Sequence, residues 1–164
     1  MIPTILMTEG VVIRLTARGG LNERQVIAEY QQIEAKVGFA SFSTNGPGVG
    51  TGIGKRRQQK FRSRLAQGDF VELLFAVDGT IAFSARIVDF VSGAVPISCP
   101  WGADSVPTVF GGGLEVNRTW FRIDNIRPCL QGTSGLVFAG GSGGSGNSLQ
   151  TVLAKSQFVF GYVH

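Results

Sequence analysis

The chain has 164 residues and a mass of 17.4 kDa; 43% of its residues are hydrophobic, 16% are charged, and its mean hydropathy is +0.19. A chain of this length is sufficient to form one hydrophobic core. The composition excludes an acidic disordered tail and a coiled coil, since both need far more charge. No apolar run reaches the roughly 18 residues of a membrane helix, and residues 1–9 lack the basic start of a signal peptide. We expect a single domain, spanning residues 1–164, in the cytoplasm and away from membranes.

The positive charge is concentrated in one segment. The net charge is +4 and the pI about 9.5, yet residues 35–68 carry seven Lys or Arg and no Asp or Glu, which leaves −3 for the rest. Two interpretations are open: a solvated face of a surface helix, or a surface that holds nucleic-acid phosphates through counterion release. We favour the second. Six of these cations fall within ten positions: Lys55, Arg56, Arg57, Lys60, Arg62 and Arg64.

The first half of the chain predicts two strands and two helices. Alternating apolar residues predict a strand over 10–17. Asn22 followed by Gln25 has the pattern of a helix capping box, and apolar residues at helical spacing predict a helix over 23–36. Residues 38–44 have strand-like composition. Residues 55–66 can form a second helix that turns its apolar side inward and its cations outward; the inward residues are Phe61 and Leu65.

The glycine-rich loop before the second helix does not match a known nucleotide-binding motif. A phosphate-binding P-loop needs Gly and then Ser or Thr where this chain has Val49 and Arg56. The dinucleotide-binding spacing of glycines also fails in every register of this loop. We therefore predict no nucleotide site of either kind.

The second half is dominated by strands. Two apolar stretches, 70–77 and 80–91, flank Asp78-Gly79, which is a strong hairpin signal. A loop over 92–118 precedes a strand at 119–126, in which Trp120 is expected in the core, and 158–163 predicts a last strand. The Gly/Ser segment 140–146 has the composition of a flexible loop or linker. The elements together indicate a mixed fold rich in strands.

Catalytic and metal-binding groups are sparse. The only histidine is the last residue, His164, which makes a Ser-His or Cys-His nucleophile system improbable. The acidic residues are scattered singly, without the pairing that a metal-dependent nuclease needs. Cys99 and Cys129 have neither close spacing nor histidine partners, so we expect free thiols. We predict a binding domain that uses no metal or cofactor, and not an enzyme.

Four short segments between residues 10 and 128 carry a resemblance to a known family. They are Phe42-Ser43-Thr44, the stretch 71–77 followed by Ala85-Arg86-Ile87, the pair Pro100-Trp101, and the stretch 121–126. In this order they resemble the YTH domains and their EVE relatives in the PUA-like superfamily. The first segment resembles a strand end that carries one aromatic wall of a base pocket, and Pro100-Trp101 resembles the second aromatic wall at the start of a long loop. The second segment is similar to the family's central hairpin, and the last is similar to the closing strand. The resemblance implies an α+β fold, a PUA-like mixed β-barrel of about six strands flanked by two or three helices.

The resemblance also implies a pocket for one flipped, methylated base. Its walls would be Phe42 and Trp101, with Ser43 beside them, and the third wall would be Val106, Val109 or Phe110. Asn22 could contact the base edge, although it could equally be a helix N-cap. Trp101 could instead be a core aromatic. Stacking is worth roughly 1–3 kcal/mol per base. The backbone contacts would come from the six clustered cations and from Arg18.

The expected function follows from this resemblance. Prokaryotic relatives serve as the DNA-reading module of modification-dependent restriction systems of the McrBC kind, joined to a nuclease or motor domain. We therefore expect a DNA-binding module that recognises a methylated base. Two alternatives stay open: an RNA reader of N6-methyladenosine, which would contact the 2′-hydroxyl, and a basic protein-interaction module.

Overall fold

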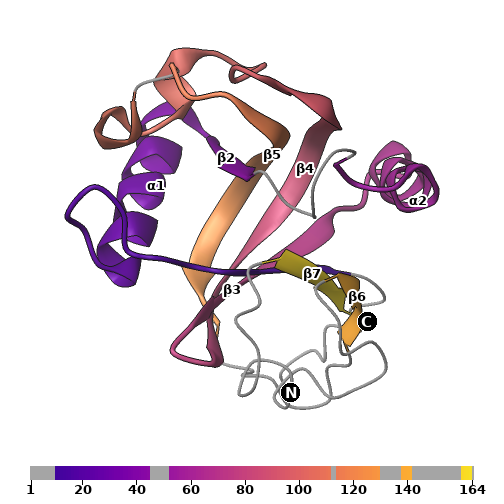
Figure 1. Ribbon diagram of the computed structural model, residues 1–164, viewed down its shortest axis with the longest axis horizontal. Coiled ribbons are helices and arrows are strands. Elements are labelled where there is room, and N and C mark those ends of the chain that lie inside the picture. Colours follow the sequence, from indigo (N-terminus) through magenta and orange to yellow (C-terminus); the bar gives the residue numbers. More distant parts are fainter. Residues whose placement is uncertain (1–9, 45–51, 112–113, 130–137, 142–159, 164) are drawn as a thin grey trace.

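The computed structural model describes residues 10–44, 52–111, 114–129, 138–141 and 160–163, and Figure 1 shows the sheet and the α-helices that they form. The helices are α1 (Glu23–Val37) and α2 (Lys55–Ala66), with two short 3-10 turns, η1 (Ala103–Ser105) and η2 (Thr108–Phe110). The strands are β1 (Gly10–Arg14), β2 (Ala40–Thr44), β3 (Val71–Val77), β4 (Thr80–Ile97), β5 (Asn117–Pro128), β6 (Phe138–Gly141) and β7 (Phe160–Val163). The expected α+β class is confirmed.

The strands form one mixed sheet in the order β2-β5-β4-β3-β1-β7-β6. β1 and β3 pair in parallel, and the other neighbours pair antiparallel. Among the described residues the edge strands β2 and β6 do not pair with each other, so the sheet is not closed into a barrel. Three register shifts along the β4–β5 ladder bend it, because a bulge adds a local kink and extra twist.

Both helices pack on one face of the sheet. The main core joins apolar residues of α1 to β2, β3 and β5, and it includes Phe61, the fully buried residue of α2. Phe61 meets the rings of Phe90 and Tyr162 at centroid distances of 5.9 and 6.3 Å. Leu65 packs against the same core. The predicted inward side of α2 is therefore confirmed.

The helix ends follow the sequence signals. The Asn22 side chain accepts a hydrogen bond from the Gln25 backbone, and the Gln25 side chain accepts one from the Asn22 backbone, both at 2.9 Å. This capping box satisfies two N–H groups that the first turn leaves unpaired. α1 ends at Gly38, whose φ of 97° lies in the left-handed region that favours glycine.

The predicted loop over 92–118 is wrong at both ends. β4 continues to Ile97 and β5 begins at Asn117, where the two strands pair. Trp120 is fully buried, as predicted, and its indole N–H donates to the Ile97 carbonyl at 2.9 Å. That bond helps to hold the extended end of β4, although this end contains Gly93 and Pro96, which are residue types typical of turns.

Several smaller expectations can be checked. The hairpin at Asp78-Gly79 is confirmed, with positive φ at both residues. Both cysteines are free thiols, as predicted. Gly140 and Gly141 lie in β6, which the sequence did not predict, while 142–146 fall outside the described residues. In the described part of the chain, neither α-helix has the length and apolarity to cross a membrane.

Candidate functional site

A cavity of about 190 Å³ lies where the end of β1, the first half of α1 and the end of β2 meet. Three strands separate β1 from β2 in the sheet order, so the curl of the sheet brings their ends together. We call this space the aromatic cavity. It is lined by Ile13, Arg14, Leu15, Thr16, Arg18, Val26, Tyr30, Phe42, Ser43 and Thr44.

Aromatic rings in tilted and edge-on contact form the inner wall of the aromatic cavity. The Tyr30 ring lies 5.2 Å from the Phe42 ring and 5.6 Å from the Phe110 ring, measured between centroids. Phe42 in turn meets Phe75 edge-on at 5.2 Å. Such distances are those of favourable aromatic pairs, and all four rings are buried. The wall is therefore part of the hydrophobic core and is preformed.

A chain of polar contacts fixes the rim. Arg18 Nη2 donates to Glu115 Oε1 at 2.8 Å, and its guanidinium lies 4.6 Å from the Phe110 ring centroid. Asn117 Nδ2 donates to the same Glu115 oxygen at 2.9 Å and to Ser43 Oγ at 2.7 Å. A carboxylate can only accept, so it orients the Asn117 amide. Three segments distant in sequence are thereby held together around the aromatic cavity.

The pocket residues expected from the sequence separate into two groups. Phe42 and Ser43 line the aromatic cavity, and Phe110 lies behind it, against Tyr30. Trp101 is half-buried in the turn before η1 and is not among the described residues that line the cavity. Asn22 caps α1, so its alternative interpretation as an N-cap is confirmed.

Tyr30 lines the cavity but was not expected there from the sequence. Its side chain is only 2% exposed, and this burial raises the pKa of its hydroxyl, with the nearby Arg18 opposing the shift. The helical spacing of Tyr30 indicates a core residue, and that is correct. Nothing local in the sequence indicates that the core there borders an empty space, because β1 and β2 approach only through the curl of the whole sheet.

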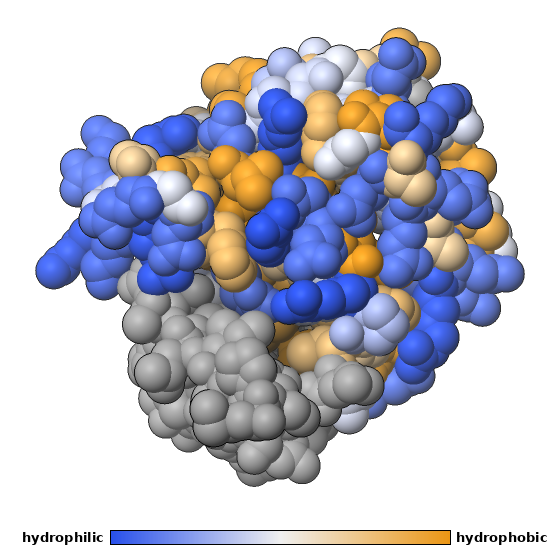
Figure 2. Space-filling view, turned by 180° about the vertical axis from the view of Figure 1, so that it is seen from behind, coloured by the Kyte–Doolittle hydropathy of each residue, from blue (hydrophilic) through white to orange (hydrophobic). Residues whose placement is uncertain are grey.

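The basic segment borders a second hollow, open to solvent and about 670 Å³ in volume, which we call the basic groove. The guanidinium carbon of Arg57 lies 3.7 Å from the ring centroid of Tyr162, in a cation–π contact. Burial raises the pKa of Tyr162 to about 12, and the charge of Arg57 opposes the shift. Figure 2 shows the hydrophilic residues of α2 projecting at one side of the molecule. The basic groove is lined by Gly54, Lys55, Arg56, Arg57, Lys60 and Tyr162.

The other two cations of the segment turn back onto the protein. Arg62 donates to the Phe90 carbonyl at 3.0 Å and lies over the Phe90 ring. Arg64 donates to the Asp69 carboxylate at 2.9 Å and to the Phe70 carbonyl at 3.2 Å. These contacts attach α2 to β4 and to the segment just before β3. The six predicted backbone-binding cations therefore divide into four at the basic groove and two that brace the helix.

The start of α2 is anchored to β4. Gly52 has φ +69°, and a Cβ added there would lie 2.5 Å from Ser92 Oγ and 2.9 Å from backbone atoms of Gly93. The next residue, Ile53, is buried, and its N–H donates to Ser92 Oγ at 2.8 Å. Gln58 then donates to the Ile53 carbonyl at 2.7 Å. This close approach fixes where the basic groove begins.

The aromatic cavity and the basic groove lie on the same face of the sheet. Tyr162, which lines the groove, is paired with Val11 across the β1–β7 ladder. Ile13, which lines the cavity, is two residues further along β1 and belongs to the same core cluster. Residues i and i+2 of a strand share one face, so the paired strands β1 and β7 each contribute a lining residue from the same face, Ile13 to the cavity and Tyr162 to the groove.

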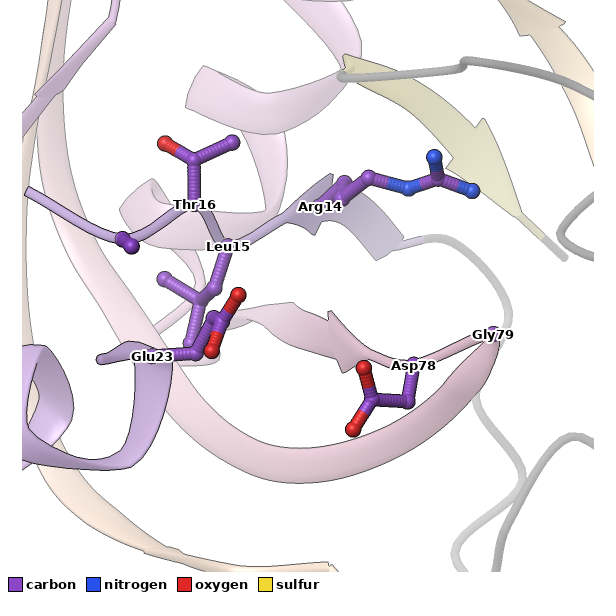
Figure 3. A pocket seen from close by; sticks show the side chains of 7 residues that line it. Arg14, Leu15, Thr16, Glu23, Asp78 and Gly79 are labelled. Atoms are coloured by element: carbon purple, nitrogen blue, oxygen red, sulfur yellow. The ribbon is translucent and has the colours of Figure 1, made fainter.

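A third hollow, of about 530 Å³, adjoins the aromatic cavity and shares Arg14, Leu15 and Thr16 with it. Figure 3 shows the carboxylates of Glu23, at the start of α1, and Asp78, in the β3–β4 turn, on one side of this space, while the Arg14 side chain extends away from both. Within the described residues no three His, Cys, Asp or Glu side chains come close enough to hold a metal ion. Two carboxylates without further ligands do not make a metal centre.

Comparison of the chain with family models, with curated proteins and with solved structures gives no match in any of the three searches.

Proposed function

We propose that this domain binds DNA and reads a methylated base, which is taken out of the stack into the aromatic cavity while the basic groove holds the neighbouring phosphates. The observation that carries the proposal is that adjacent strands of the sheet contribute to both features, because Ile13 of β1 lines the aromatic cavity and Tyr162 of β7 lines the basic groove. In this proposal Phe42 and Tyr30 supply the aromatic surface, and Trp101 does not take part.

The chemistry of the two places supports this assignment. A protein that reads a base modification encloses the base among aromatic and apolar groups and contacts its edge by a few hydrogen bonds. The aromatic cavity offers two aromatic side chains beside apolar ones, with Ser43, Thr16 and Arg18 as polar groups. A buried methyl group adds on the order of 0.8 kcal/mol. Recognition of this kind requires neither an acid–base pair nor a bound metal.

The basic groove supports binding to a polyanion. Lys55, Arg56, Arg57 and Lys60 line it, and no acidic residue is among its lining residues in the described part of the chain. Each phosphate that such cations neutralise releases counterions from the nucleic acid. Phosphate contacts give affinity and position, while the base in the cavity gives specificity.

We also propose the wider setting. The curled sheet would be an open variant of the PUA-like barrel of YTH and EVE domains. The protein would then act as the specificity module of a modification-dependent restriction system, with nuclease or motor activity supplied by another domain or subunit. This setting rests on analogy with those families.

The test is fluorescence anisotropy at one stated salt concentration with matched oligonucleotides. The set contains duplex DNA, single-stranded DNA and RNA, each unmodified, with 5-methylcytosine and with N6-methyladenine. We expect tighter binding to one modified DNA, and Trp101→Ala should keep that preference because Trp101 lies outside the cavity lining.

Each other outcome has a definite meaning. A preference for modified RNA would identify an RNA reader. Equal, salt-sensitive binding to all oligonucleotides would support the role of the basic groove but not the recognition of a base. Absence of binding would favour a protein-interaction module. Loss of the preference in Trp101→Ala, with the fold intact, would restore Trp101 as a wall of the pocket.

A further inference from the structure

Two arginines of α2 lie against aromatic rings, but their guanidinium groups differ in what else they contact. Arg62 lies 4.3 Å from the Phe90 ring centroid, donates to the Phe90 carbonyl at 3.0 Å and has the Asp89 carboxylate at 3.9 Å. Arg57 lies 3.7 Å from the Tyr162 ring centroid, and within the described part of the chain its guanidinium forms no hydrogen bond or ion pair. The guanidinium of Arg57 is therefore held in place while its N–H donors stay available to a ligand.

The ring that holds Arg57 is itself fixed. Tyr162 is 5% exposed, pairs with Val11 across the β1–β7 ladder and lies 6.3 Å from the Phe61 ring, measured between centroids. Burial raises the pKa of Tyr162 to about 12, so the hydroxyl keeps its proton at neutral pH. The charge of Arg57 is therefore not neutralised by a phenolate, and it acts on whatever enters the basic groove.

The chemistry of a guanidinium indicates the ligand group that suits Arg57. Its N–H donors form a rigid, planar fork that matches two oxygens of one phosphate. Binding costs less when the side chain is already ordered in the free protein. Lys55 and Arg56 line the same groove but are exposed, so they must be ordered when a phosphate binds. Arg57 differs from them because its ring contact has already ordered it.

We infer that Arg57 is the phosphate anchor of the basic groove: two of its guanidinium N–H groups bind the oxygens of one nucleic-acid phosphate. Tyr162 is the positioning residue that holds the guanidinium for this contact. Lys55 and Arg56 add positive charge around it. The inference rests on the proposed function and extends it, because it names the residue that fixes the register of the nucleic-acid backbone on the protein.

A pair of charge-conserving variants tests the anchor. Arg57→Lys keeps the positive charge but loses both the planar contact with Tyr162 and the fork. Arg56→Lys is the matched control, since it makes the same change at an exposed position of the same groove. Anisotropy with the DNA oligonucleotides named above should show about tenfold weaker binding for Arg57→Lys. The control should differ from wild type by less than about twofold.

Two variants at Tyr162 test its positioning role. Tyr162→Phe keeps the ring under Arg57 and should retain DNA affinity, whereas Tyr162→Leu removes the ring and should bind DNA as weakly as Arg57→Lys. Adding Arg57→Lys to Tyr162→Leu should then cost little more, because residues that act together are not additive. Urea unfolding confirms that each variant is folded under the binding conditions. If Tyr162→Leu does not fold, the two arginine variants still decide the question.

A chemical scan of the DNA identifies the phosphate. Each oligonucleotide carries one neutral methylphosphonate linkage at a different position. One linkage should weaken binding of wild type and of Arg56→Ala, yet have no effect on Arg57→Ala, which has already lost the contact.

The outcomes separate the inference from the proposed function. Absence of DNA binding by wild type would contradict both. DNA binding with equal affinities for Arg57→Lys and Arg56→Lys, or a scan without any linkage whose effect depends on Arg57, would overturn the anchor and leave the proposed function standing. Full affinity in a folded Tyr162→Leu variant would overturn the positioning role of the ring.

Discussion

The aromatic cavity and the basic groove are built in different ways. The cavity uses the ends of β1 and β2 and the first half of α1, with Phe110 behind it, and its rings belong to the main hydrophobic core. The groove uses the first turns of one helix and a single residue of β7, and its cations face solvent or lie half-buried. In the cavity, the aromatic lining residues also stabilise the fold. In the groove, charge can change while the fold stays intact.

The largest effect should come from the wall of the cavity. Phe42→Ala removes a buried ring that contacts Tyr30 and Phe75, so we expect the unfolding free energy to fall by about 3–5 kcal/mol. Arg56→Ala, at an exposed position of α2, should change it by no more than about 0.5 kcal/mol. Urea unfolding of the two variants gives both values. Similar losses in the two would remove the distinction between cavity and groove.

A smaller loss of stability is expected where the groove is anchored. Gly52→Ala forces a Cβ against Ser92 and Gly93 and imposes a positive φ on a residue with a side chain, so it should cost about 2 kcal/mol. It should also weaken DNA binding, because the first turn of α2 must shift.

Gly54→Ala is the matched control for the anchor. A Cβ at Gly54 meets nothing within 4 Å among the described residues, and its φ is −59°. The control should be near wild type in both urea unfolding and DNA affinity. An equal loss in the two variants would show that the close approach at Gly52 is not what fixes α2.

Removing cations from the basic groove should change the salt dependence of DNA binding. Removing one cation that contacts a phosphate should lower the slope of log K against log salt by about 0.9. We expect this for Lys55→Ala and Arg56→Ala, which line the groove. Arg62→Ala is the contrast, because its guanidinium is bonded to the Phe90 carbonyl, and it should lower stability with little change of slope. Binding titrations at four or so salt concentrations measure the slopes, and equal slopes in all three variants would contradict the division of the cations.

A difference between local and long-range contacts explains what the sequence could predict. The capping box of α1, the inward face of α2 and the turn at Asp78-Gly79 depend on neighbours within a few residues, and all were predicted correctly. The position of Trp101 relative to Phe42 depends on the path of the chain through η1 and on the curl of the sheet. The same holds for the contact between Arg18 and Glu115, which lie 97 positions apart. Local patterns carry no information on such encounters, so the sequence did not predict Tyr30 at the cavity.

The smallest effect should come from a buried acid in β3. Glu72 is 8% exposed, and loss of hydration raises the pKa of its carboxyl, with Arg127 opposing the shift. The Glu72 carboxyl therefore holds its proton more tightly in the native state than in the unfolded state. The stability that this difference contributes is lost as pH rises through the raised pKa. Glu72→Gln should consequently stabilise the protein at neutral pH, by less than about 1 kcal/mol. The gain should shrink as pH falls toward the ordinary carboxyl value. Urea unfolding of wild type and variant across this pH range measures the gain in stability.

A Glu72→Gln variant less stable than wild type at neutral pH would mean that the attraction to Arg127 outweighs the loss of hydration. Because Glu72 lines neither the aromatic cavity nor the basic groove, DNA affinity at neutral pH should not change.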